Sequence, residues 1–454
     1  MKEFRVLSPT AILGYGFPAA SFEEGMSHKP HVIAVDAGST DPGPYYLGSG
    51  KSFTDRGAVK RDLEFMLTAA CTENIPMIIG TAGGSGADSH LDWNVDIVRE
   101  IAAEKGLSFK MAVISAQIDK EVIRQRFAQG KVVALKPAPV PTMQDIEDSV
   151  NIVAQMGHEP IMEALQAGAQ VIITGRAYDP TVFAALAIMQ GYDPGLALHM
   201  GKILECAAIA ATPGSGSDCM FGYLRDDHFE LATLSPARKC TTTSVAAHTL
   251  YEKSNPTRLP GPGGVLDLTQ TTFEQTTDNT VTVRGSRFIP DDAYFVKLEA
   301  ARHVGHRTIS FAATCDPIMI NQLDDIIAAV KERVAGNFSD IGDFFLDFKV
   351  YGHHGASFYG DTGSMPAEAA IIIEAVAPTA QLADTICSFA RSTLLHFGYP
   401  GRKSTAGNLA FPFSPSDFAG GDVYEFSLYC LMAVDSPTEL FPIKIFQCDK
   451  GVLV

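Results

Sequence analysis

Along the N-terminal half of the chain, short runs of apolar residues alternate with longer segments in which apolar positions recur at helical spacing. The short runs have the length and β-branched content of buried strands, and they lie at 31–35, 76–80, 111–115, 132–135 and 171–174. The longer segments fit helices at 57–72, 91–105, 120–129, 145–168 and 181–190. Strands joined by helices of this length pair in parallel. We therefore predict an α/β domain over residues 1–214, a mainly parallel sheet flanked by helices, whose last clear strand is 171–174.

The pattern changes after about residue 215. Thr-rich alternating segments such as 281–283 and a Pro/Gly cluster at 260–264 indicate an antiparallel insertion. Beyond it the predicted elements are a strand at 296–312, a helix at 318–334, strands at 344–351 and 369–376, a helix at 381–397 and a strand at 423–432. This βαββαβ order is that of the ferredoxin-like split motif. We expect residues 215–454 to form an α+β domain with an antiparallel insertion and a ferredoxin-like core.

Composition narrows the classes of partner. The chain has 454 residues, of which 46% are hydrophobic and 19% charged, so it can bury a large core. Its formal net charge of -17 would repel a phosphate backbone. No apolar run approaches the roughly 18 residues that a membrane span needs. We expect a soluble, cytoplasmic protein whose partners include neither nucleic acid nor a membrane.

Residues that commonly bind metals are not spaced as ligand sets. The eight cysteines are scattered without a C-x-x-C pair, which favours reduced, mostly buried thiols over a disulfide framework or a thiolate zinc site. His353 and His354 are adjacent, so on most backbones their side chains point in different directions, and no H-E-x-x-H motif accompanies them. We therefore predict no metal site and no cofactor.

The strand at 31–35 ends in a loop that contains Asp36, Ser39 and Thr40. Glycine and proline at this density allow the backbone to come close to a ligand, and the three side chains offer donors and acceptors. The alternative is an ordinary turn between a strand and a helix. Because ligands bind at the carboxyl ends of parallel strands, we predict that these three residues contact a substrate.

The strand at 76–80 ends in a second, glycine-rich loop. This loop lacks the G-K-[ST] of a P-loop and the spaced glycines of the dinucleotide fingerprint. Consecutive backbone amides in such a loop can form a nest for a carboxylate or a phosphate. We predict that Thr81, Gly83, Gly84 and Ser85 bind substrate.

The strand at 171–174 is followed by Arg176 and Asp179 in a tight turn. An arginine and an aspartate at the end of a strand fit a clamp for a carboxylate and its partner, although they could also pair only with each other and brace the turn. Lys202 and Glu205 lie one turn apart on the next predicted helix and form a second charged pair. We predict that Arg176, Lys202 and Glu205 are catalytic and that Asp179 contacts the substrate.

Two further loops carry cations. The loop at 398–421 contains Arg402, Lys403 and Asn408, and it is long enough to suggest a function. We predict that Lys403 and Asn408 contribute to binding an anionic substrate, with a solvated loop as the alternative. Lys136, at the tip of another loop, is either a site lysine or a solvated charge.

The segments ITGRAYDP at 173–180 and KILECA at 202–207 resemble the I-T-G-R-x-x-D and G-H-x-x-E-C-G segments of the acyclic terpene utilisation AtuA family. Residues 82–84 are similar to that family's N-A-G-G loop. The chain departs from the pattern at Lys202, where histidine is usual, and at Ala207, where glycine is usual. Longer members carry an additional small ferredoxin-like domain, so the resemblance implies a separate small subunit of that kind.

Together these features favour a catabolic enzyme that acts on a small organic acid or acyl-CoA by proton transfer, as a hydratase, lyase or isomerase does. In this interpretation Glu205 is the general base or acid, and Lys202 and Arg176 hold the carboxylate and stabilise an enolate-like charge. Cys206 is less attractive as a nucleophile because no Cys-His spacing accompanies it. The alternative is a non-catalytic binding or scaffold subunit that works with the small ferredoxin-like partner. We expect a homo-oligomer in either case.

Overall fold

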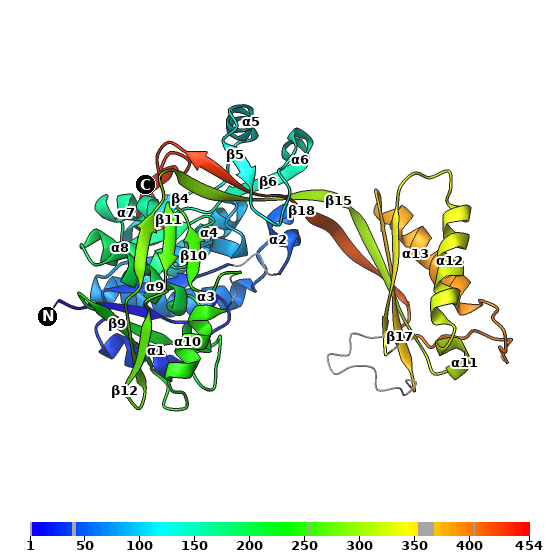
Figure 1. Ribbon diagram of the computed structural model, residues 1–454, viewed down its shortest axis with the longest axis horizontal. Helices are drawn as coiled ribbons and strands as arrows, with labels where there is room; N and C mark the ends of the chain where they lie inside the picture. The colour runs from blue at the N-terminus through cyan, green and yellow to red at the C-terminus, as the bar shows by residue number, and fades with distance from the viewer. Residues whose placement is uncertain (1, 39–41, 252–253, 353–366, 404) are drawn as a thin grey trace. The chain divides into compact units, whose positions relative to one another are not determined.

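The computed structural model of the chain describes residues 2–38, 42–251, 254–352, 367–403 and 405–454 (Figure 1). The chain divides into two compact units, a larger one of residues 1–302 and 426–454 and a smaller one of residues 303–425. The boundary expected at 214/215 falls inside the larger unit. The physical reason is that the segment after this point returns to the first sheet, where residues 220–224 pair with residues 4–8.

The helices of the larger unit are α1 (Ala19–Ser27), α2 (Pro44–Ser49), α3 (Arg56–Glu73), α4 (Asp88–Lys105), α5 (Lys120–Ala128), α6 (Met143–Asp148), α7 (Glu159–Gln166), α8 (Thr181–Met189), α9 (Pro194–Leu204) and α10 (Thr242–Leu250). Its strands are β1 (Phe4–Ser8), β2 (Val32–Asp36), β3 (Met77–Gly80), β4 (Ser108–Ile114), β5 (Val132–Ala134), β6 (Ser149–Ala154), β7 (Val171–Thr174), β8 (Met220–Leu224), β9 (His228–Thr233), β10 (Arg258–Gly261), β11 (Gly264–Asp267), β12 (Thr272–Thr277), β13 (Thr280–Arg284), β14 (Arg287–Pro290), β19 (Ile443–Asp449) and β20 (Val452–Leu453). Two long strands, β15 (Tyr294–Thr314) and β18 (Asp417–Val434), have residues in both units.

The main sheet of the larger unit has the strand order β12-β13-β9-β8-β1-β2-β3-β7-β4-β19-β20. Its centre, from β1 to β4, is parallel. Antiparallel strands extend it on both sides. The prediction of a mixed α/β architecture with a large, centrally parallel sheet is therefore confirmed, and β7 has the predicted bounds.

Helices cover both faces of this sheet because successive residues of a strand point to opposite sides. Ile172 of β7 belongs to one apolar core together with Val182 of α8. Its neighbour Ile173 belongs to the other core, together with Leu63 of α3 and Ile97 of α4. The parallel strands are thus buried on both faces, which explains their uninterrupted apolar runs.

Two predictions for the segment between β4 and β7 were wrong. The strand at 132–135 was expected in the parallel sheet, but β5 pairs antiparallel with β18. The helix expected at 145–168 is instead α6, β6 and α7, and β6 pairs antiparallel with the first part of β15. The β-branched residues Val150, Ile152 and Val153 favour a strand at this point, and the distant β15 supplies its partner.

The smaller unit contains the second part of β15, α11 (Pro317–Ile320), α12 (Leu323–Asn337), β16 (Phe345–Tyr351), β17 (Ala369–Ala377), α13 (Ala380–Leu395) and the first part of β18. Its strands have the order β16-β17-β15-β18. Alternate residues of β17, among them Ile371 and Ile373, are buried in one core with Ile326 of α12 and Ile386 of α13. The helices therefore pack on one face of this sheet.

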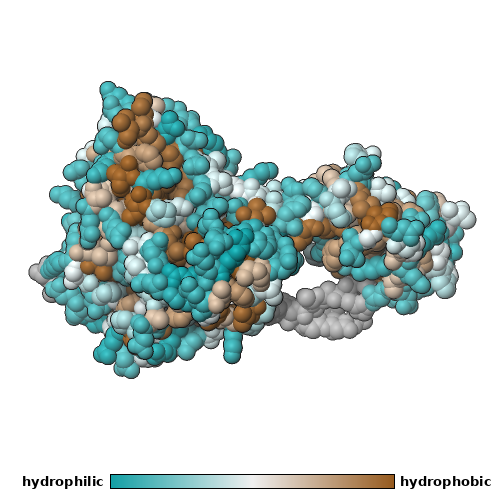
Figure 2. Space-filling model, turned by 90° about the horizontal axis from the view of Figure 1, so that it is seen from above, coloured by the Kyte–Doolittle hydropathy of each residue, from teal (hydrophilic) through white to brown (hydrophobic). Residues whose placement is uncertain are grey.

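None of the helices in the described ranges combines the length and the hydropathy that crossing a membrane requires. On the face drawn in Figure 2, hydrophobic residues form separate patches among hydrophilic ones.

Candidate functional site

The candidate site lies in the larger unit, at the edge of the sheet where β2, β3 and β7 end. These three strands are adjacent and parallel. Their carboxyl ends therefore place Asp36, Thr81 and Arg176 at one edge, and the Arg176 Nη1 lies 3.4 Å from the Thr81 Oγ1. The polar residues that follow three separate strands thus meet in space.

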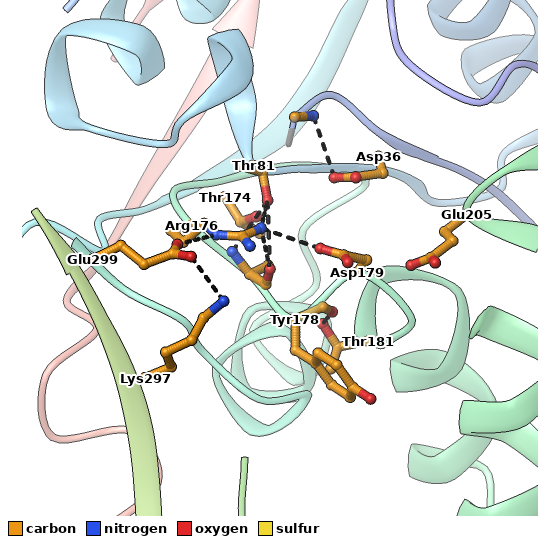
Figure 3. Close-up of polar contacts among 12 residues, drawn as sticks. Asp36, Thr81, Thr174, Arg176, Tyr178, Asp179, Thr181, Glu205, Lys297 and Glu299 are labelled. Atoms are coloured by element: carbon orange, nitrogen blue, oxygen red, sulfur yellow. Dashed lines mark hydrogen bonds and ion pairs between the residues drawn. The ribbon is translucent and has the colours of Figure 1, made fainter. Parts of the chain in front are cut away.

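Two nitrogens of Arg176 donate hydrogen bonds to two carboxylates and a backbone carbonyl (Figure 3). Its Nε donates to Glu299 Oε2 at 2.7 Å, and its Nη1 donates to Asp179 Oδ1 at 3.1 Å and to the carbonyl of Ala177 at 3.0 Å. Only 4% of Arg176 is exposed. Burial alone would lower its pKa, but the charges of Glu299 and Asp179 outweigh burial and raise it. Arg176 and Asp179 therefore pair, but not only with each other as the alternative had it, because Glu299 also binds Arg176.

Glu299 is the buried counterpart of Arg176. It lies on β15 and has no exposed surface, and its second oxygen, Oε1, is 2.7 Å from the Nζ of Lys297. Burial favours the neutral carboxyl, but Arg176 and Lys297 overcome this effect and hold the pKa of Glu299 at about 2. Glu299 is thus ionised at neutral pH and fixes the guanidinium of Arg176.

The glycine loop after β3 packs directly against the turn that carries Arg176. A Cβ on Gly86, whose φ is +71°, would lie 2.1 Å from the backbone N of Arg176. The Gly84 N–H donates to the carbonyl of Thr81 and the Gly86 N–H to the carbonyl of Ala82. These two amides hold the loop itself, which differs from the anion nest expected for Gly84. Gly83 and Ser85 are buried in the same loop.

Asp36, Asp179 and Glu205 bring three carboxyl groups into this region. Figure 3 shows Asp179 between Arg176 and Glu205. Asp36 is 6% exposed, and burial, followed by the negative charges of Asp179 and Glu205, raises its pKa well above the ordinary value, against the opposing effect of Arg176. This environment favours the protonated form of Asp36.

Glu205 forms an ion pair with Lys202 at the end of α9. The two side chains are 6% and 2% exposed, so the pair is buried. The helix begins at an Asp193 cap, whose side chain accepts from the Leu196 N–H, and Glu205 occupies the C-cap position. The predicted one-turn spacing of Lys202 and Glu205 therefore brings the two charges into contact.

Cys206 and Tyr251 lie beside this ion pair. The Cys206 Sγ is 3.6 Å from the Tyr251 hydroxyl, and the Lys202 Nζ is 5.2 Å from the centre of the Tyr251 ring. Burial, reinforced by the charge of Glu205, raises the pKa of Cys206. A thiol with a raised pKa is a poor nucleophile, which agrees with the low rank that the sequence gave Cys206.

The remaining residues singled out in the sequence are either outside the described ranges or in contact with other parts of the chain. Ser39 and Thr40 lie outside the described residues, as do His353 and His354. Lys403 and Asn408 belong to the smaller unit, where the Asn408 Nδ2 donates to the Phe397 carbonyl at 3.2 Å and so holds its own loop. Lys136 is exposed, in agreement with the solvated alternative.

Sequence reasoning missed Lys297, Glu299 and Tyr251. The first two had a usable signal, because Lys297 and Glu299 alternate with Val296 and Leu298 and therefore share one face of a strand. A charged pair inside an apolar strand predicts buried partners. No comparable signal distinguished Tyr251 from other aromatic residues.

Replacing Glu299 with glutamine should destabilise the protein in a pH-dependent way. The pKa of Glu299 falls from 4.5 to about 2 on folding, which corresponds to about 3 kcal/mol of stability at pH 7. A lowered carboxyl pKa stabilises fully above its unfolded value and loses this effect as the pH falls toward the folded value. Urea unfolding of Glu299→Gln should therefore show a loss of about 3 kcal/mol at pH 7 that shrinks below pH 4.5.

The matched control is Glu100→Gln, which removes a carboxylate from exposed ion pairs with Arg56 and Lys60. This change should lower the free energy of unfolding much less, because such pairs are screened by water. If both variants lose the same free energy of unfolding, Glu299 does not stabilise the protein through its buried ion pairs.

Arg176→Lys should also destabilise the protein, although it keeps the charge. One ammonium group cannot reproduce the separate contacts of Nε with Glu299 and of Nη1 with Asp179, so we expect a loss of about 2 kcal/mol in urea unfolding. Arg124→Lys, at an exposed arginine that binds Glu147, should lower the free energy of unfolding much less. If Arg176→Lys leaves the free energy of unfolding unchanged, the geometry of the guanidinium group is unimportant.

Comparison with known proteins assigns the chain to a family. The model of the acyclic terpene utilisation family protein AtuA matches residues 56–219 and 236–412, which is more than half of the chain. No curated protein and no solved structure gives a match. The matched ranges include Arg176, Glu205 and Glu299. The chain therefore belongs to the acyclic terpene utilisation AtuA family.

Proposed function

We propose that the chain is an enzyme that moves protons on a small organic acid or its CoA thioester, in a reaction of the hydratase, lyase or isomerase type. The observation that carries this proposal is the pair of buried carboxyl groups in different environments. Asp36 has a raised pKa, whereas Glu205 contacts the ammonium group of Lys202. Carboxyl groups whose environments differ in this way are suited to the separate tasks of acid and base.

In the proposed reaction, Glu205 removes a proton from the carbon next to the substrate's carbonyl group. Negative charge then develops on the carbonyl oxygen, and the positive charges of Lys202 and Arg176 stabilise it. Asp36, in its protonated form, gives a proton to the leaving group or to another carbon of the substrate. Asp179 is 23% exposed at its side chain, more than Arg176, and is the member of the cluster most open to an incoming ligand.

Family membership supports a role in acyclic terpene utilisation. The terpene-related substrates that fit the proposed chemistry are acids and their CoA thioesters, because a carbonyl group is what makes the neighbouring C–H acidic. We also infer that the smaller unit is ferredoxin-like. Its strands, numbered in chain order, lie in the order second, third, first, fourth, and its helices follow the first and third strands.

A non-catalytic binding or scaffold subunit is the second candidate. It is favoured by the contacts of Arg176, whose Nε and Nη1 are engaged by protein groups. Such a subunit would work with a small ferredoxin-like partner, and the purified chain alone would then show no proton exchange.

Hydrogen exchange into substrates provides a test that needs no knowledge of the product. The chain would be incubated in D₂O with a panel of short and branched organic acids and their CoA thioesters, and deuterium incorporation would be followed by mass spectrometry. We expect exchange at the carbon next to the carbonyl for at least one compound, and a loss of about 100-fold or more in Glu205→Gln. Asp226→Asn, at an exposed aspartate, should exchange at the normal rate.

The outcomes separate the two candidates. Exchange that is abolished in Glu205→Gln but normal in Asp226→Asn supports the enzyme. The absence of exchange across the panel would contradict it and favour the subunit. Exchange that persists in a folded Glu205→Gln would remove Glu205 from the mechanism.

Asp36→Asn separates catalysis from stability. Because the pKa of Asp36 is raised, the folded protein keeps this proton at a pH at which the unfolded chain has released it, and the release on unfolding makes the folded state less stable as the pH rises. Asparagine resembles the protonated form, so the variant should be at least as stable as the natural protein, with a melting-temperature difference that grows from pH 5 to pH 8. Its exchange rate should nevertheless fall by about 100-fold. If the melting temperature of the variant minus that of the natural protein is smaller at pH 8 than at pH 5, Asp36 is not protonated in the folded protein.

A further inference from the structure

Two histidines and an aspartate converge in the smaller unit, at residues that the proposed function does not use. The His303 Nε2 lies 3.2 Å from the Asp422 Oδ1, and the His306 Nδ1 lies 3.1 Å from the same oxygen. One ligand atom from each of the three residues lies within 4.8 Å of the other two. This is the one group with such spacing among the residues that the structure describes.

The neighbouring strands β15 and β18 bring these residues together. Gly420 of β18 lies against the side chain of Arg307 on β15, and Tyr424 of β18 contacts the ring of His303 at a centroid distance of 5.3 Å. Residue numbers therefore rise along one strand as they fall along the other. Asp422 lies midway between Gly420 and Tyr424, and this places it opposite the segment that carries both histidines.

Gly305 explains why both histidines can reach one carboxylate. In a regular strand, residues three apart point to opposite faces, so His303 and His306 should not meet. Gly305 has a φ of +147°, and a Cβ there would lie 2.5 Å from the Ala377 carbonyl oxygen. Only glycine fits this conformation, which interrupts the alternation of β15 between the two histidines.

The distances from Asp422 to the two histidines match the edges of a metal coordination shell. Ligand atoms about 2.0–2.1 Å from a tetrahedral zinc ion lie roughly 3.3–3.4 Å from one another. The two measured distances to Asp422 Oδ1 are close to this value. We propose that His303, His306 and Asp422 form a binding site for a divalent transition-metal ion of the zinc type.

The ligand chemistry favours this class of ion over calcium or magnesium. Imidazole nitrogens suit zinc, copper, nickel and iron, whereas calcium and magnesium require mostly oxygen ligands. The His303, His306 and Asp422 side chains are 37%, 34% and 44% exposed, so an ion and its remaining water ligands have access. A bound ion would connect β15 to β18 across more than 100 residues of sequence and so stabilise the smaller unit.

The structural alternative is that Asp422 only accepts hydrogen bonds from the two imidazoles. Isothermal titration calorimetry distinguishes the two, using the full chain after dialysis against a chelator and zinc chloride as the titrant. We expect one zinc ion to bind at this site in the natural protein. His306→Gln and Asp422→Asn should each weaken this binding by about 10-fold or more.

Two controls locate the ion. His396→Gln, at an exposed histidine of the same unit, should leave zinc affinity unchanged. The double variant His353→Gln/His354→Gln tests the adjacent histidines and should also retain the site. Loss of zinc binding in this double variant, with normal binding in His306→Gln, would overturn the proposal.

A second measurement covers the case in which a ligand variant fails to fold. Cobalt added to the natural protein should give the intense visible absorption of a tetrahedral site, and excess zinc should displace it. Zinc should also raise the melting temperature of the natural protein, since it binds the folded chain. No zinc binding by calorimetry, or no effect of zinc on melting together with an octahedral cobalt spectrum, would overturn the proposal.

Discussion

The buried ion pair between Arg176 and Glu299 is the contact on which the candidate site depends. Removing two charges from water costs several kcal/mol for each ion, so a buried pair is stable only when its remaining polar atoms are satisfied. Lys297 forms an ion pair with the second oxygen of Glu299, while Asp179 and the Ala177 carbonyl accept hydrogen bonds from the Nη1 of Arg176. The same contacts tie the turn after β7 to β15, 123 residues further along the chain. The ion pair therefore positions the turn as well as its charges.

The balance of charge around this pair accounts for the state of Asp36. The cluster contains one more carboxyl group than it has cations, the acids being Asp36, Asp179, Glu205 and Glu299 and the bases Arg176, Lys202 and Lys297. Glu299 contacts two of the cations and has a pKa of about 2, whereas the charge of Arg176 does not offset the burial of Asp36. The excess negative charge is thus removed most easily by protonating Asp36, which leaves a proton donor beside Glu205.

Local patterns predicted the parts of this arrangement that local forces determine. The strand at 171–174, the charged turn after it and the one-turn spacing of Lys202 and Glu205 follow from periodicity and helix geometry. The partners that come from distant segments do not follow from these local patterns. Glu299 binds Arg176 only because β15 returns beside the first sheet, and β6 is a strand because β15 pairs with it. Single-sequence periodicity contains no information on such pairings, which also explains why His303 and Asp422 were not associated with each other.

The protonation state of Asp36 tests the charge balance most directly. Carbon-13 NMR of protein labelled at the aspartate carboxyl carbon would be recorded at a pH where ordinary aspartates are fully ionised. The account predicts one carboxyl signal that remains at the protonated position and disappears in Asp36→Asn. If every aspartate signal of the natural protein is at the ionised position, Asp36 is an ordinary carboxylate and the account is contradicted.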